Sequence, residues 1–333
     1  MQHEVNLSKY NLRTDLMIES IENLENIKLS ENEFNDVKVT EIDVDEKIGD
    51  LIGKKVGKYI TIEFDDVTDT NNRNHVLDIF KKQLAKFIKL DKKDDLVLII
   101  GLGNDTSTPD SLGPLTIGGI NVTNHLYELN IVDTSYQRVA AITPSVMGKT
   151  GIETSTIIKS IADSTDPKLI IVIDSLASTS IERLNKTIQI TNSGISPGSG
   201  IGNRRKEISL DTLNIPVVAI GVPTVVDAIT IVSDTINYMT KHYIYSKEHI
   251  NIPKYKLVVN NNYLKEDIKI NKEDKEMLLG LVGKLSNEEL KLLLNDVLSP
   301  IGYNLIVTPK EIDYLIECLS NIIYSGINDI LKS

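Results

Sequence analysis

Three short apolar runs, each followed by a segment with helical spacing, most constrain how this 333-residue chain can fold. Residues 96–100, 169–173 and 217–220 are rich in Ile, Val and Leu and are too short for helices. Continuous apolar runs of this length are typical of strands buried on both faces of a parallel sheet. The pattern predicts an α/β fold, with a mainly parallel sheet flanked by helices and joined by right-handed crossovers.

Helical periodicity fills the segments between and after these runs. Apolar residues recur at helical spacing in three of them, which predicts helices at 73–90, 115–129 and 152–163. After the third run, Thr224 and Asp227 can cap the start of a long helix. Near the C-terminus, Thr308 and a following proline precede an apolar stripe that begins at Ile312. We therefore expect a helical C-terminal part at about 272–333.

The first sixth of the chain is strongly acidic. Residues 1–55 hold 13 Asp and Glu against 7 Lys and Arg, and their apolar residues are sparse and weakly periodic. We expect a loosely ordered or peripheral segment there, with one candidate strand at 37–44. Residues 56–64 alternate between polar and apolar and are rich in β-forming side chains, so they predict a strand.

Charge and cysteine content argue against several classes of protein. Lys and Arg total 36 and Asp and Glu 47, so the net charge of −11 argues against a surface that coats nucleic acid. The single cysteine, Cys318, rules out internal disulfides, and its place in an amphipathic segment predicts core packing. No apolar run approaches the ~20 residues that cross a bilayer, and the N-terminus is too polar for a signal peptide. We expect an intracellular protein with no membrane partner.

Nucleotide-binding motifs are incomplete. Gly101 and Gly103 follow an apolar run, as in a dinucleotide-binding turn, but Thr106 stands where the third glycine belongs. The glycine-rich segment 198–203 fails in the same way, and neither segment contains a phosphate loop. We therefore expect tight turns and no cofactor. Serine hydrolase chemistry lacks an evident base, because no histidine falls between 126 and 241.

Two aspartates stand where open α/β sheets bind ligands, outside the carboxyl ends of the strands. Asp110 lies in the loop after the run at 96–100, and Asp174 directly follows the run at 169–173. Two neighbouring carboxyl groups separate their pKa values, which gives one acid and one base at the same pH. Such a pair can activate water and protonate a leaving amine. The plainer alternative is that each aspartate only caps a turn or a helix.

The same two aspartates could instead bind the metal ion of a metal-dependent hydrolase. Asp110, Asp174 and His125 are suitable ligand types for a divalent ion. No compact ligand spacing supports such a site, and we expect no metal.

Residues 187–207 form an unusual segment, in which glycines precede a cluster of basic residues that includes Arg204 and Arg205. Glycines such as Gly198 and Gly200 let a loop approach a substrate closely, and arginines grip acidic side chains. The alternative is a solvated basic turn.

Taken together, long segments of this chain resemble the germination proteases of spore-forming bacteria. The matching segments are GLGN at 101–104, TPDSLGP at 108–114, VMGKTGIETS at 146–155, IDSLASTSIERLN at 173–185, TIQITNSGISPGSGIGNRRKEIS at 187–209, IPVVAIGVPTVVDAITI at 215–231 and VTPKEID at 307–313. The resemblance covers nearly the whole chain, including the opening NLSKYNLRTDL, and is densest from 98 to 231. Residues 25–55 and 246–275 show no functional match.

The resemblance implies an atypical aspartic endopeptidase with an α/β fold similar to that of hydrogenase maturation proteases. Its expected substrates are the small acid-soluble proteins that coat spore DNA, cut in the cytoplasm of the forespore and spore core during germination. It implies a homotetramer that makes no direct contact with nucleic acid. The family's two catalytic aspartates fall on Asp110 and Asp174. Candidate substrate-binding residues in the matching segments are Gly148, Thr150, Glu153, Gly198, Gly200, Arg204 and Arg205.

The resemblance also implies a zymogen that removes its own N-terminal segment by a cut between an acidic residue and a large apolar one. The bond between Asp15 and Leu16 fits, although Met17 replaces the small residue usual in the family. We therefore expect a propeptide at 1–15 and one peptidase domain at 16–333, with its core at about 56–245. Two other functions stay open: a metal-dependent peptidase of the hydrogenase-maturation type, and a spore-protein binding module without catalysis.

Overall fold

The computed structural model of the protein describes residues 14–21, 24, 27–131, 135–197, 206–249, 251, 268–298 and 305–332. Its described residues fall into two compact units. The larger unit spans Arg13–Val225 and Thr308–Ser333, and it contains both predicted aspartates. The smaller unit is made by Val226–Val307. None of the described helices is both long and apolar enough to span a bilayer.

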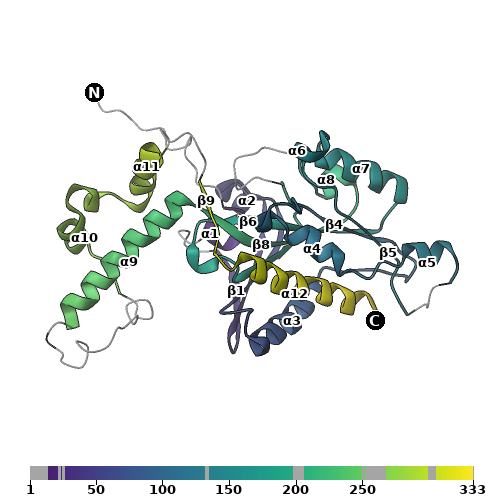
Figure 1. Ribbon diagram of the computed structural model, residues 1–333, viewed down its shortest axis with the longest axis horizontal. Coiled ribbons are helices and arrows are strands. Elements are labelled where there is room, and N and C mark those ends of the chain that lie inside the picture. The colour runs from purple at the N-terminus through teal and green to yellow at the C-terminus, as the bar shows by residue number, and fades with distance from the viewer. Residues whose placement is uncertain are drawn as a thin grey trace. The chain divides into compact units, whose positions relative to one another are not determined.

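The described strands form one nine-stranded sheet (Figure 1). Their bounds are β1 Leu29–Phe34, β2 Val37–Val44, β3 Gly57–Phe64, β4 Val97–Gly101, β5 Val139–Ile142, β6 Leu169–Ser178, β7 Thr187–Thr191, β8 Val217–Asp227 and β9 Ile306–Val307. The order across the sheet is β1-β2-β3-β7-β8-β6-β4-β5, and β9 pairs with the end of β8. Strand β1 is exposed along its whole length and forms one edge of the sheet.

The α/β class, the flanking helices and the helical C-terminus are confirmed, but the sheet is mixed. Strand β4 pairs in parallel with β6, as the apolar runs predict, and also with β5, which they did not predict. Strands β1, β2, β3, β7 and β8 pair antiparallel, each with the next. The expectation of a mainly parallel sheet is therefore wrong for this part. Strands β2, β3 and β7 alternate polar and apolar residues and carry weaker signals than unbroken apolar runs, while β8 is such a run but pairs antiparallel with β7.

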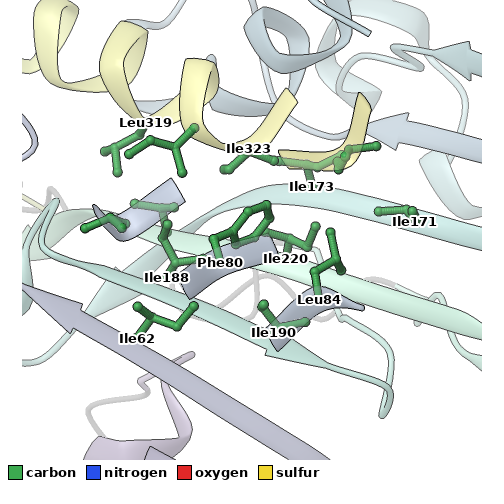
Figure 2. Close-up of a cluster of buried hydrophobic side chains, with 14 of the residues drawn as sticks. Ile62, Phe80, Leu84, Ile171, Ile173, Ile188, Ile190, Ile220, Leu319 and Ile323 are labelled. Atoms are coloured by element: carbon green, nitrogen blue, oxygen red, sulfur yellow. The ribbon is translucent and has the colours of Figure 1, made fainter. Parts of the chain in front are cut away.

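One face of the sheet carries the largest hydrophobic cluster (Figure 2). The helices that pack there are α3 Thr70–Leu84, α4 Leu112–Gly118 and α12 Ile312–Lys332, with α12 in contact with the other two. Side chains alternate across a strand, so Ile171 and Ile173 of β6 point to this face. Cys318 is 4% exposed within the cluster, which confirms its expected role in packing.

The opposite face is covered by shorter elements. Helices α7 Thr154–Thr165 and α8 Leu210–Leu213 pack against Ile170 and Val172 of β6. Farther along the same face, α1 Met17–Ile21 and α2 Glu46–Ile52 close a third cluster, which includes Leu176 of β6. Leu16 and Met17 are fully buried in this cluster.

Three sequence expectations need correction. Residues 16–21 and 29–52 are ordered into helices and strands and are partly buried, so the acidic N-terminal part is not merely peripheral. The expected helix at 115–129 is two helices, α4 and α5 Asn124–Glu128, because the chain breaks at a glycine pair. At Gly119 an added Cβ would lie 2.4 Å from the ring of Tyr324, so α12 takes the space of a side chain there.

The third correction concerns the start of the long helix. Strand β8 continues through Thr224, and α9 Ala228–His249 begins four residues later. Asp227 alone caps it, accepting a hydrogen bond of 2.6 Å from the backbone N–H of Thr230. In the same smaller unit, α9 packs against α10 Lys272–Leu279 and α11 Asn287–Leu298, with the short helix η7 Gly280–Lys284 between those two.

Candidate active site

The parallel strands β4 and β5 end at one edge of the sheet, beside the middle of β6. The last paired residues are Ile100 with Ile142 and Gly101 with Ile173. Directly after β4, the backbone N–H of Leu102 donates a 2.8 Å hydrogen bond to the carbonyl of Ile173. The chain segment that leaves β4 therefore meets β6 at this level, the place where open α/β sheets bind ligands.

Asp174 lies one residue beyond that last pair. The sequence predicted that Asp174 directly follows the strand, but it lies within it. Strand β6 continues to Ser178, whereas its neighbour β4 stops at Gly101. Asp174 is 6% exposed, and its Oδ1 accepts a 3.0 Å hydrogen bond from the N–H of Ser175. Alternation places its side chain on the face shared by Val172 and Leu176. Because β4 ends before Asp174, this buried carboxyl group lies at an edge of the sheet although β6 itself continues.

Asp110 is the last residue of a short helical turn, η2 Thr108–Asp110, in the loop after β4. Both of its backbone groups are fixed: its N–H donates to the carbonyl of Ser107 and its carbonyl accepts from the N–H of Asn104, each at 2.8 Å. Gly103 makes this possible with a φ of 110°, since an added Cβ there would lie 2.1 Å from the carbonyl oxygen of Asp110. The turn is therefore closed tightly on the end of β4.

A third residue holds this turn and was missed by the sequence analysis. The hydroxyl of Thr224, fully buried in β8, donates a 2.7 Å hydrogen bond to the carbonyl of Pro109, the residue before Asp110. The carbonyl of Thr224 in turn accepts from the hydroxyl of Thr308 at 2.9 Å. A polar residue after the proline in an otherwise apolar run was the available signal, but it was interpreted as a helix cap.

The structure brings the two predicted aspartates to the same sheet edge. The turn η2 packs against β6, and Asn104 and Leu102 connect it by backbone hydrogen bonds to the residue before Asp174. His125 does not join them: within the described ranges, no three His, Cys, Asp or Glu side chains are grouped to hold a metal ion.

The predicted substrate-binding residues fall into two sets. Gly148 and Thr150 are exposed in α6 Met147–Thr150, which follows β5, and Lys149 of this helix forms an ion pair with Asp105 in the loop before η2. Glu153 lies directly before α7 and is half-buried. The other four, Gly198, Gly200, Arg204 and Arg205, lie outside the described residues.

The predicted cleavage bond lies beside β6, beyond Asp174. Asp15 pairs with Ala177: its N–H donates to the Ala177 carbonyl at 3.2 Å, and its Oδ2 accepts from the Ala177 N–H at 3.0 Å. The segment before this bond is held by polar contacts, including a 2.7 Å hydrogen bond from Lys54 Nζ to the carbonyl of Thr14. The segment after it, from Leu16, is held by apolar burial.

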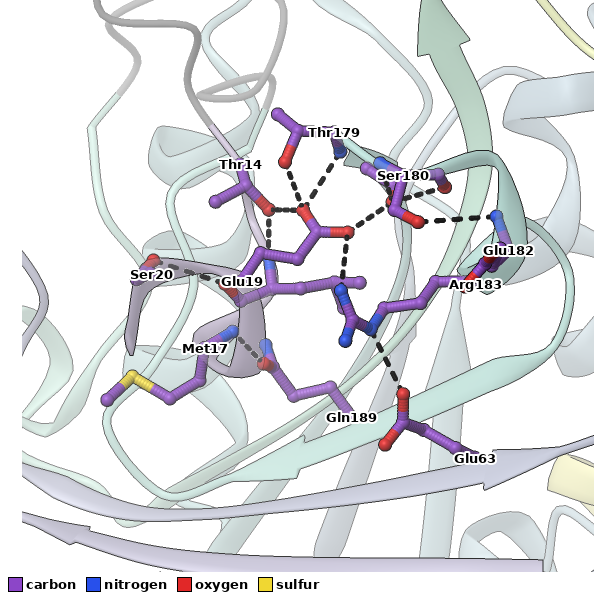
Figure 3. Close-up of polar contacts among 12 residues, drawn as sticks. Thr14, Met17, Glu19, Ser20, Glu63, Thr179, Ser180, Glu182, Arg183 and Gln189 are labelled. Carbon is purple, nitrogen blue, oxygen red and sulfur yellow. Dashed lines mark hydrogen bonds and ion pairs between the residues drawn. The ribbon is translucent and has the colours of Figure 1, made fainter. Parts of the chain in front are cut away.

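Gln189 of β7 binds the chain on both sides of the same bond, and Figure 3 shows its contact with Met17. Its Oε1 accepts a 2.6 Å hydrogen bond from the N–H of Met17, and its Nε2 donates a 3.3 Å hydrogen bond to the carbonyl of Asp15. Ile188 and Ile190 belong to the large cluster, so alternation places Gln189 on the other face, the face of Asp174. This second contact residue also escaped the sequence analysis, because a glutamine inside a strand carries no recognisable motif.

Comparison with known proteins agrees with the resemblance found in the sequence. A sequence model of the family described as "Germination protease" matches residues 5–333. Germination proteases of Bacillus cereus and Priestia megaterium are 44% and 42% identical to this chain over 350 and 353 residues. Each alignment covers 98% of this chain and 95% of the relative.

Among solved structures, a nickel–iron hydrogenase maturation protease from Thermococcus kodakarensis is similar, with a TM-score of 0.28 and 17% identity over 43% of this chain and 80% of that chain. The family match extends over nearly the whole sequence, and the relatives are more than 40% identical. The chain therefore belongs to the germination protease family and is an endopeptidase with a spore protease function.

Proposed function

We propose that Asp110 and Asp174 form the catalytic pair of this protease. The observation that carries the proposal is their convergence: the turn of Asp110 is closed on the end of β4, and Asp174 lies one residue beyond the last pair of β4 with β6. Both carboxyl groups therefore belong to one sheet edge. The two residues are 64 positions apart in the sequence, so it is the fold that places them at this common edge.

The chemistry proposed for the pair is hydrolysis by an activated water. One aspartate, ionised, takes a proton from water as the water oxygen attacks the peptide carbonyl. The other, protonated, donates its proton to the nitrogen of the leaving amine. Two carboxyl groups that share a poorly solvated site divide into such an acid and base, because the ionisation of one disfavours the ionisation of the other.

The substrates we propose are small acid-soluble spore proteins, cut after acidic residues in the forespore and spore core. The family match supports this, as do the relatives from Bacillus cereus and Priestia megaterium, both of which are germination proteases. We also propose the homotetramer that the resemblance implies, with no cofactor and no direct contact with nucleic acid.

Self-processing at the bond between Asp15 and Leu16 belongs to the same proposal, and would remove residues 1–15 as a propeptide. Two features support this bond. It lies at the boundary between a segment held by hydrogen bonds and a segment held by apolar burial, so the latter stays docked after a cut. It also lies on the face of the sheet that carries Asp174, next to the continuation of the same strand.

The experiment that tests the pair compares Asp110→Asn and Asp174→Asn with a matched control, Asp163→Asn, an exposed aspartate of α7. Each pair variant should lose at least 10²–10⁴-fold of its peptide cleavage rate, because each removes one partner of a proton transfer. Cleavage of a purified small acid-soluble spore protein is followed by mass spectrometry, and folding by circular dichroism. A folded pair variant that cleaves at the rate of the Asp163→Asn control contradicts the proposal.

A further inference from the structure

Glu19 is a buried carboxylate that accepts its hydrogen bonds from neutral donors and lies beside the guanidinium of Arg183 (Figure 3). Its side chain is only 2% exposed. One oxygen accepts hydrogen bonds of 2.9 Å from both the N–H and the hydroxyl of Thr179, and the hydroxyl of Ser178 donates to the other. The hydroxyl of Thr14 also donates to the first of these oxygens, Oε2. Thr179 directly follows β6, so this carboxylate holds the end of the strand that carries Asp174.

Two cations lie near this carboxylate, but at longer range than its hydroxyl donors. Arg183 forms a long ion pair with it, and the ammonium group of Lys54 is near enough to interact with it electrostatically. The guanidinium of Arg183 lies 3.8 Å from Glu19 Oε1, and it makes a closer contact of 3.0 Å with Glu63. Lys54 uses its ammonium group to bind the carbonyl of Thr14. Burying a carboxylate is costly unless a cation pairs with it. A cation placed directly on Glu19 would therefore be strongly favoured.

The backbone nitrogen of Leu16 is one hydroxyl away from this carboxylate. It donates a 3.0 Å hydrogen bond to Oγ1 of Thr14, and that same oxygen donates to Glu19. Leu16 directly precedes α1 and Glu19 is the third residue of the helix. This is the spacing at which a glutamate side chain reaches back to the backbone nitrogen before a helix. Among the described residues, Thr14 bridges the two groups through its hydroxyl.

Hydrolysis of the bond between Asp15 and Leu16 would change this arrangement. Water adds across the peptide bond, so Asp15 gains a carboxylate and the Leu16 nitrogen becomes an amine that takes up a proton. Thr14 then leaves with the released segment, while Leu16 keeps its fully buried side chain and Met17 its hydrogen bond to Gln189. The new ammonium group is thereby created beside Glu19 at the moment that Glu19 loses the Thr14 hydroxyl.

We propose that Glu19 is the binding site for the α-ammonium group of Leu16, and that this ion pair fixes the end of β6 in the processed enzyme. The inference rests on the proposed cut between Asp15 and Leu16. It adds a reason for the position of the cut, because a cut one residue away would place the ammonium group at a different distance from the carboxylate. It also connects processing to Asp174, through the strand that Glu19 holds.

The first test uses chains made with a defined N-terminus, by removing a cleavable tag. One begins at Leu16, a second carries one extra glycine before Leu16, and each is made with Glu19 and with Glu19→Gln. The exposed Glu33→Gln, on β1, controls for the loss of a carboxylate. The readout is the rate at which the N-terminal amine is acetylated by a limiting reagent, measured by mass spectrometry after digestion.

Acetylation needs the neutral amine, and an ion pair that raises the amine pKa by about one unit lowers the neutral fraction about tenfold. The chain that begins at Leu16 should therefore react about tenfold more slowly than its Glu19→Gln variant, whereas the Glu33→Gln variant stays slow. The chain with the extra glycine should react fast with either residue at position 19. Equal rates for the Leu16 chain with Glu19 and with Gln would overturn the proposal.

A second test separates this inference from the proposed self-processing. Full-length protein and its Glu19→Gln variant are incubated until cleavage, and intact mass and activity on a spore protein are measured. If the variant is cut at Leu16 but stays at least about tenfold less active than the cut wild type, the ion pair is supported. Wild-type activity in the cut variant contradicts it. Failure of the wild type to be cut at this bond refutes the self-processing, and the defined chains above still decide the role of Glu19.

Discussion

The hydroxyl of Thr224 is the smallest feature on which the candidate active site depends. It joins β8 to the carbonyl before Asp110, across 115 residues of sequence. In Thr224→Val the shape is kept and the donor is lost, so the Pro109 carbonyl is left without this partner. Such an unsatisfied group costs about 1–3 kcal/mol, and a catalytic group displaced by about 1 Å can cost 10²-fold in rate.

We predict that Thr224→Val lowers kcat about 10–100-fold with little change in KM, while Thr224→Ser retains most of the activity. The measurements are steady-state kinetics on a peptide substrate and the free energy of unfolding for each variant. A valine variant with wild-type kcat would show that the turn keeps its place without this hydrogen bond.

Gly103 belongs to the same scale, because one missing Cβ lets the turn close. In Gly103→Ala the new carbon would lie 2.1 Å from the carbonyl oxygen of Asp110, so the turn must open. We expect loss of cleavage activity by at least 10²-fold in a folded protein. The matched control is Gly53→Ala, which has a similarly unusual φ of 67° but no atom within 4 Å, and should lose only about 1 kcal/mol of stability. Comparable activities of the two variants would argue against a strict position for Asp110.

At the scale of the elements, Glu41 of β2 links this strand by ion pairs to strand β3 and to the segment after helix α3. Its carboxylate pairs with Lys58 of β3 at 2.8 Å and with Lys86, which follows α3. Burial raises the pKa of Glu41, but hydrogen bonds from Lys58 and Lys86 outweigh it, so the pKa lies below the ordinary value of 4.5. A carboxylate with a lowered pKa stabilises the fold fully above its unfolded pKa, and this contribution is lost as the pH falls through the folded value.

We therefore predict that Glu41→Gln lowers the free energy of unfolding by about 0.5–1 kcal/mol at pH 7, a small amount because the lysines are partly exposed. The difference from wild type should shrink as the pH falls below about 4.5, where Glu41 becomes protonated in the unfolded chain. Urea unfolding from pH 7 to pH 4 measures it, with Glu33→Gln as the exposed control. A difference that grows toward low pH would mean that burial, not pairing, dominates at Glu41.

For the whole molecule, a test with metal ions distinguishes catalysis by the aspartate pair from the metal-dependent alternative. We predict that cleavage survives exhaustive dialysis against a chelator, because the proposed pair needs only carboxyl groups and water. Activity is compared before dialysis, after dialysis and after return of single divalent ions. Loss of cleavage that one divalent ion restores would favour the metal-dependent alternative.

The sequence predicted the parallel centre of the fold and the sheet edge of Asp110 and Asp174 for the same reason. Strands buried on both faces are unbroken apolar runs in the sequence, so the residues that follow them can be assigned to the edge of the sheet where the strands end. The contacts of Thr224 and Gln189 could not be predicted in this way, because each is a single polar residue inside a strand whose partner lies far away in sequence. The burial of Leu16 and Met17 was hidden by the acidic residues around them.

Strand β1 has a consequence for how this protein behaves at high concentration. An exposed edge strand is a template on which another chain can add its own strand. Here the edge reads Leu-Ser-Glu-Asn-Glu-Phe, so Glu31 and Glu33 stand in its centre. A second copy that approached edge to edge would bring the same two negative charges against them. The open side of the sheet thus disfavours growth into fibres at high protein concentration.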